Sequence, residues 1–77
     1  MYEPIEVMAY HHKDGSIVPL RFKMNDKEYR CGDLLSVKEN NYAGNPMLVF
    51  KLKKGTKVYD LHLEKKTGKW YLAPPNK

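Results

Sequence analysis

Apolar and polar residues alternate along this chain in short runs, and each run ends at residues that favour turns. No stretch repeats apolar residues with the period of an amphipathic helix, and no helix-capping pattern opens one. Alternation along a strand puts successive side chains on opposite faces of a sheet. The pattern therefore predicts antiparallel strands joined by hairpin turns.

The first predicted turn lies in "HKDGSI", because Asp-Gly is favoured in two-residue type I′ hairpin turns. Counting outward from that turn puts Val7 opposite Phe22 and Ala9 opposite Leu20. Apolar residues then meet apolar residues on one face, so turn chemistry and register agree.

The second predicted turn is "MNDK", with its Asn-Asp pair as the loop. This register puts Phe22 opposite Tyr29 and Leu20 opposite Cys31. The apolar face of the first hairpin therefore continues into a third strand.

The third strand is expected to continue through Gly32, which would form a bend or a bulge. The loop "NNYAGN", residues 40–45, would then connect it to the next strand, with Leu35 opposite Phe50. Two further turns, "KKGT" and "KKTGKW", complete the series. They would bring apolar pairs face to face: Phe50 with Tyr59, Leu48 with Leu61 and Leu63 with Leu72.

One face of the resulting sheet is predicted to be apolar. It would carry Val7, Ala9, Leu20, Phe22, Tyr29, Cys31, Leu35, Val37, Leu48, Phe50, Tyr59, Leu61, Leu63, Trp70 and Leu72. A short sheet with one apolar face and no covering helix must curl on itself. We therefore expect a single all-β domain, residues 1–77, whose six antiparallel strands form a meander. Its shape would be a small barrel or strongly curled sheet, SH3-like in general shape. The alternative is an open curled sheet that covers its apolar face by dimerising.

The composition narrows the class of protein further. The chain has 77 residues, 42% of them hydrophobic, which is typical of one small globular domain with a thin core. Its single cysteine allows no internal disulfide and fits a reducing compartment. No apolar run approaches the length of a membrane span, and the N-terminus lacks the pattern of a secretory signal. We expect a cytoplasmic protein.

The net charge of +5 comes from the second half of the chain, where residues 41–77 hold eight lysines and two acids. Such asymmetry is a known indication of contact with nucleic acid. Candidate nucleic-acid-binding residues are Lys51, Lys53, Lys54, Lys57 and Tyr71, with the tyrosine available for base stacking. Lysines at hairpin ends also protect strand edges from aggregation, and that interpretation stays open.

Two further groups are candidates for binding a protein partner. The predicted register puts Arg21 directly opposite Arg30, with Tyr10 one row away. Like charges facing each other are unfavourable, so a bound anion or a partner's carboxylate would relieve them, as would arginines that splay apart in water.

The second group lies in the loop "ENNYAGNP", where Asn41, Tyr42 and Asn45 are the candidates. Exposed tyrosines on loops often anchor contacts. The alternative is that Tyr42 folds back and covers the open end of the barrel.

No catalytic or metal-binding set can be assembled from this sequence. His11 and His12 are adjacent on a predicted strand, so they would point to opposite faces, and His62 lies far along the chain. Cys31 is expected to face the core as a small apolar residue. We therefore expect a noncatalytic protein that needs no cofactor and no metal.

Several stretches resemble small uncharacterised bacterial proteins, mainly of the Firmicutes type. They are "PIEV", "PLRF", "LLSVKE", "AGNPMLVF" and "KWYL". The resemblance spans nearly the whole chain, but it rests on strand and turn residues and implies no activity and no site residues.

Two functions follow as hypotheses. The first is an interaction module that binds a protein partner or itself through the "NNYAGN" loop or a sheet edge. The second is a nucleic-acid-binding barrel that uses the lysine-rich half.

Overall fold

The computed structural model describes residues 2–73 as strands and turns, without a helix in that range. Seven strands make up the fold. They are β1 (Glu3–His11), β2 (Ile17–Met24), β3 (Lys27–Arg30), β4 (Asp33–Tyr42), β5 (Asn45–Lys54), β6 (Lys57–Glu64) and β7 (Lys69–Leu72). The prediction of an all-β protein is confirmed.

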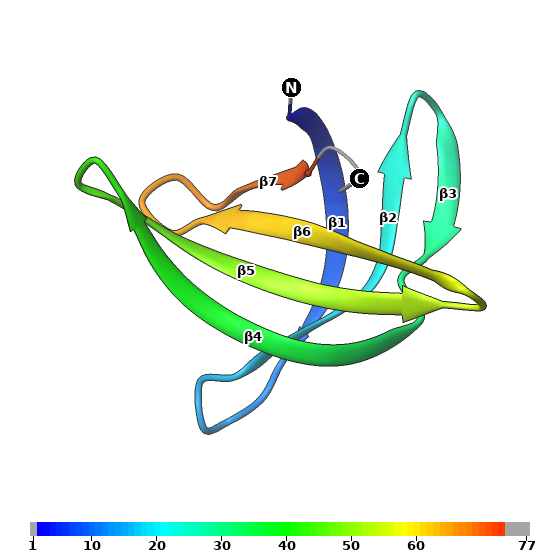
Figure 1. Cartoon of the computed structure of the whole chain (residues 1–77), viewed down its shortest axis with the longest axis horizontal. Helices are drawn as coiled ribbons and strands as arrows, with labels where there is room; N and C mark the ends of the chain where they lie inside the picture. The colour runs from blue at the N-terminus through cyan, green and yellow to red at the C-terminus, as the bar shows by residue number, and fades with distance from the viewer. Residues whose placement is uncertain (1, 74–77) are drawn as a thin grey trace.

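All seven strands belong to one antiparallel sheet with the order β3-β2-β1-β7-β6-β5-β4. Strands that follow each other along the chain are neighbours in the sheet, except for β3 and β4, and the first strand also pairs with the last. β1 pairs with β7, where Ile5 lies opposite Trp70, and β3 and β4 lie at the two edges although they follow each other in sequence. The sheet curls strongly into a half-barrel, with β2 and β3 turned across the ends of β5 and β6 (Figure 1).

The apolar core fills the concave side of this half-barrel. Its fully buried members are Cys31, Phe50, Leu52 and Leu61. Partly buried side chains from the other strands, including Trp70 of β7, pack around them. The predicted strongly curled sheet is therefore confirmed, with seven strands in place of six.

The seventh strand arises because the expected third strand is divided at Gly32. This glycine has a φ of +79°, a left-handed conformation that ends β3 and sends the chain into β4 in a new direction. The preceding residue, Cys31, donates its backbone N–H to the Leu20 carbonyl of β2 at 3.0 Å. Its own carbonyl accepts a hydrogen bond from the Tyr59 hydroxyl of β6. Cys31 and Gly32 together form the corner of the half-barrel.

The first hairpin contains two deviations from the predicted register that compensate each other. The turn after β1 is longer than two residues, so Ala9 lies opposite Pro19. A bulge then leaves Leu20 without a partner, and Val7 meets Phe22 as predicted. The expectation that Leu20 faces the core is wrong: Pro19 is buried in its place and Leu20 is 47% exposed.

The later hairpins keep the predicted faces but are shifted by two residues. The loop expected at 40–45 is a two-residue turn, Ala43-Gly44, with φ values of +52° and +83°. The shorter turn lets β4 and β5 pair further, so Val37 lies opposite Phe50. Likewise, β6 pairs with β5 and β7 so that Leu61 faces Phe50 and Leu72.

A second bulge changes the environment of Leu35. The register of β4 against β5 shifts between Leu34 and Ser36, so Leu35 has no cross-strand partner. It is 51% exposed, whereas Leu34 packs against the core. The expectation that Leu35 belongs to the buried face is therefore wrong.

Replacing Gly32 by alanine should destabilise the protein by about 3 kcal/mol, because a left-handed backbone and a steric clash combine. A Cβ added there would lie 2.4 Å from the Lys53 backbone oxygen. Gly15 is the matched control, since its φ is +92° and a Cβ would meet nothing within 4 Å. Urea unfolding of both variants measures the difference. Equal stability losses would contradict the assignment of Gly32 to the corner.

Candidate functional site

The edge strand β4 is the most extended unpaired feature of the sheet. It has ten residues, and no strand within residues 2–73 pairs with its outer side. Val37 is 45% exposed although it lies on the core face opposite Phe50. Together with the exposed Leu35, it leaves aliphatic surface beside open backbone groups, which is the arrangement that accepts an added strand.

A groove with a volume of about 730 Å³ opens at the end of the half-barrel. Cationic side chains and aromatic rings both line it. The cations are Arg30, Lys54 and Lys57, and the rings are those of Phe22, Tyr29 and Tyr59. The groove therefore joins the β2–β3 hairpin to the tip of the β5–β6 hairpin.

The aromatic floor of this groove is held in place by the corner. Phe22 stacks on Tyr29 with ring centroids 5.1 Å apart, and the Tyr59 hydroxyl is tied to the Cys31 carbonyl. Burial raises the pKa of the Cys31 thiol to about 11 and also raises the pKa of Tyr59. The prediction that Cys31 faces the core is confirmed, and its thiol stays protonated near neutral pH.

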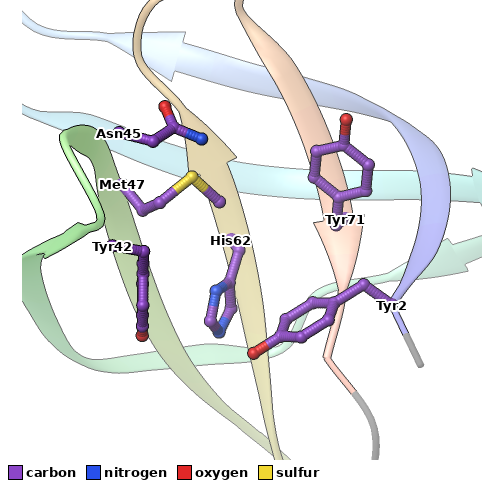
Figure 2. Close-up of a pocket in the computed structure, with 6 residues that line it drawn as sticks. All are labelled: Tyr2, Tyr42, Asn45, Met47, His62 and Tyr71. Atoms are coloured by element: carbon purple, nitrogen blue, oxygen red, sulfur yellow. The ribbon is translucent and has the colours of Figure 1, made fainter.

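A third site lies on the convex side of the sheet, where a pocket with a volume of about 250 Å³ surrounds His62 (Figure 2). We call it the His62 pocket. Its lining residues come from β4, β5, β6, β7 and the start of the chain. They are Tyr2, Tyr42, Asn45, Met47, His62 and Tyr71.

His62 is the most buried polar residue of this pocket, with only 5% of its surface exposed. The Tyr2 ring meets it edge-on at a centroid distance of 4.8 Å, and the Tyr42 ring lies nearly parallel to it at 6.2 Å. Tyr71 is its cross-strand partner on β7. Burial lowers the pKa of His62, and the nearby Asp60 carboxylate offsets part of that effect. The imidazole is therefore held in its neutral form near pH 7.

The lysine candidates are divided between two surfaces. Lys54 and Lys57 lie opposite each other and line the groove. Lys51 and Lys53 extend from the outer face of β5, where Lys51 is the cross-strand partner of Asp60. Tyr71 belongs to the His62 pocket and is not grouped with Lys54 and Lys57.

The arginine pair is brought together as the sequence predicted. Arg21 lies opposite Arg30, and the conflict is relieved within the chain, since Arg21 Nη1 lies 3.4 Å from Glu28 Oε1. Tyr10 does not join this pair: its ring contacts His12, with centroids 4.7 Å apart.

The candidates of the "NNYAGN" segment lie on strands and not on a loop. Tyr42 ends β4, and its hydroxyl accepts a hydrogen bond from Asn40 Nδ2 at 3.1 Å. Asn45 begins β5 and donates to Glu64 Oε2 at 2.6 Å. Asn41 is exposed and lies opposite Pro46. Tyr42 is 47% exposed and lies on the convex face. It therefore neither stands on a loop nor covers the open end of the barrel, the two positions that the sequence analysis considered.

Residues 2–73 contain no group of three His, Cys, Asp or Glu side chains placed to hold a metal ion. None of their secondary structure is a helix that could cross a membrane.

Sequence reasoning missed both composite sites. His62 lies opposite Val49 of β5 and Tyr71 of β7, and the rings of Tyr2 and Tyr42 cover it. The only signal in the sequence was Tyr71, which was singled out as an available aromatic ring but for a different site. Arg30 and Lys54 line the same groove from opposite sides of the corner, an arrangement that no local pattern encodes.

Comparisons of this chain with protein-family models, curated proteins and solved structures found no match. The resemblance to small bacterial proteins therefore has no family match behind it and stays an expectation. Since no residue role can be transferred from a relative, proposals about function depend on the geometry of the three sites.

Stability should fall as the pH drops below about 6.5, because His62 accepts a proton more readily in the unfolded chain than in the folded one. Unfolding then takes up a proton, and the free energy of unfolding decreases toward lower pH. Urea unfolding at neutral pH and near pH 5 measures the loss. The variant His62→Gln should lose less stability over this range than the control His11→Gln, which alters an exposed histidine. Identical pH dependence of the two variants would refute this assignment.

Proposed function

We propose that this domain acts by binding, and that it accepts an extended segment of a protein partner as an added strand along β4. The observation that carries the proposal is the ten-residue free edge with its half-exposed Val37. Backbone hydrogen bonds to such an edge supply affinity, while alternate side chains supply specificity. We also propose a cytoplasmic location, since the free thiol of Cys31 fits a reducing compartment.

The two faces beside β4 differ in chemistry and define the partner. On the concave side, Val37 offers an aliphatic contact, and the exposed Leu35 at the bulge adds aliphatic surface two residues away. On the convex side, Lys38 lies on β4 itself, and Lys51 lies opposite Ser36 on the neighbouring strand. An added strand that alternates aliphatic and acidic side chains would match both faces.

A partner of acidic character is favoured over a second copy of this chain. Each copy carries a net charge of +5, so two copies repel each other as they approach. An acidic segment is instead attracted to the lysines beside the edge. Self-association through β4 is nevertheless a distinct outcome that the experiment below detects.

A blocked synthetic peptide of alternating valine and glutamate should bind wild-type protein and perturb the backbone amide resonances of β4. The variant Val37→Lys should weaken binding by about tenfold or more, because an added strand would bury its unpaired ammonium group. The control Val58→Lys makes the same change of charge at another valine, which is 55% exposed on β6. Titration monitored by NMR measures both affinities.

Equal affinity of the two variants would refute the β4 proposal, as would amide shifts confined to other strands. Sedimentation of the free protein is the companion measurement. A dimer that Val37→Lys dissociates and Val58→Lys leaves intact would replace the acidic partner with a second copy.

Single-stranded nucleic acid is a second candidate ligand, and the groove supports it. Cations at the rim can contact phosphates while the aromatic floor stacks bases. Arg30, Lys54 and Lys57 line the same groove as Tyr29 and Tyr59. The Tyr59 hydroxyl donates a hydrogen bond to the Cys31 carbonyl, so the position of the Tyr59 ring is fixed before a ligand binds.

If the groove binds nucleic acid, the double variant Lys54→Ala/Lys57→Ala should weaken binding more than Lys51→Ala/Lys53→Ala. Both remove two positive charges, but only the first pair lines the groove. Fluorescence anisotropy of a labelled single-stranded oligonucleotide measures binding, which should weaken roughly tenfold or more between low and physiological salt. Equal effects of the two double variants would indicate unspecific charge attraction and would reject the groove.

A further inference from the structure

The His62 pocket lies on the convex face, apart from the lysine groove and from the aliphatic side of the β4 edge. Its walls are mainly aromatic. Tyr42 stands on one side of His62 and Tyr2 on the other, and Tyr71 and Met47 also line the pocket (Figure 2). The faces of such rings carry negative partial charge, so a cavity enclosed by several rings attracts cations.

The residues that line the pocket carry no positive charge that would repel a cation. None of its lining residues is a lysine or an arginine. His62 adds no positive charge near neutral pH, because burial lowers its pKa. On the same face of β6, two residues to either side of His62, stand the carboxylates of Asp60 and Glu64, which lie opposite Lys51 and Lys69 on the neighbouring strands.

Two buried oxygens near this pocket lack a donor among the described residues. One is Asn45 Oδ1, from a residue that lines the pocket, and the other is Asp60 Oδ1. Buried acceptors without donors are uncommon in native proteins, and each contributes a negative electrostatic potential to its surroundings. Both therefore strengthen the attraction for positive charge.

The dimensions limit the ligand to a small group. A volume of about 250 Å³ lies below the range of pockets that enclose a whole drug-sized molecule. The Tyr42 and His62 ring centroids are only 6.2 Å apart, so an alkylated head does not fit between these two rings and would lie over them on the solvent side. Tyr42 and Tyr2 are about half exposed, so both can adjust to the ligand.

From these observations we propose that the His62 pocket binds an organic cation whose charge is carried by an alkylated ammonium group. The aromatic walls hold the methyl groups, and the ring faces with the neighbouring carboxylates stabilise the charge. Such a group occurs in free quaternary ammonium compounds and in methylated lysine side chains.

Choline and its neutral carbon isostere, dimethylbutanol, are the matched probes, because they have the same shape and differ in charge. Titration of the wild-type protein, followed through the ring resonances of His62 and Tyr42, should show saturable binding of choline. The isostere should bind roughly tenfold more weakly. Equal affinities would overturn the proposal in favour of an apolar pocket, and no shift with either probe would overturn it entirely.

Variants then test the walls. Tyr42→Leu should reduce the ratio of choline affinity to isostere affinity by about fivefold, whereas Tyr42→Phe should retain it within about twofold, because the ring supplies the attraction. Tyr10→Leu is the control, since it alters a tyrosine of similar exposure, 57%, outside the pocket. A ratio unaffected by Tyr42→Leu would overturn the assignment of that ring, and dispersed amide spectra verify that each variant is folded.

The last comparison distinguishes the two sources of the cation. A short peptide with a trimethylated lysine is titrated beside the same peptide with unmodified lysine and beside free choline. Tighter binding of the trimethylated peptide than of choline would identify a modified protein as the source. Equal binding of the two would identify a free ammonium compound. Binding of the unmodified peptide as tightly as the trimethylated one would overturn the requirement for alkylation.

Discussion

The hydrogen bond from the Tyr59 hydroxyl to the Cys31 carbonyl joins the corner between β3 and β4 to the interior strand β6. Cys31 also bonds to the Leu20 carbonyl, so β2, β3 and β6 meet at this one residue. Gly32 then turns the chain where a side chain would collide with the Lys53 backbone. Because Cys31 is fully buried, its polar backbone groups must be paired, and the curl of the sheet follows from that pairing.

This corner also determines which surfaces stay open. A hairpin would have paired β3 with β4, but the turn at Gly32 sends them to opposite edges of the sheet. The chain therefore leaves one edge at β3, which is short, and one at β4, which is long. The same corner brings Arg30 to the tip of the β5–β6 hairpin, where Lys54 and Lys57 lie. The free β4 edge and the groove are thus both consequences of one change of direction.

The sequence predicted the face of most strand residues but not the register of every pair. Alternation decides only whether a residue faces in or out, so a register shift by two residues keeps every side chain on its predicted face. Phe50, for example, lies opposite Leu61 in place of Tyr59, and both pairings put apolar residues on the same face. The turn Ala43-Gly44 was hidden because alanine seldom adopts a positive φ. Bulges at Leu20 and Leu35 reverse alternation locally, and nothing in the neighbouring sequence distinguishes them.

The His62 pocket could not have been predicted, because it depends on long-range pairing. β6 lies near the middle of the sheet and is covered on both faces, so Leu61, His62 and Leu63 are all buried in succession. A histidine at an outward position is buried only when side chains from distant strands cover it. Here Tyr2 arrives through the pairing of β1 with β7, and Tyr42 through the extension of β4 beyond the expected loop. Each of these features was absent from the sequence prediction, and the pocket requires both.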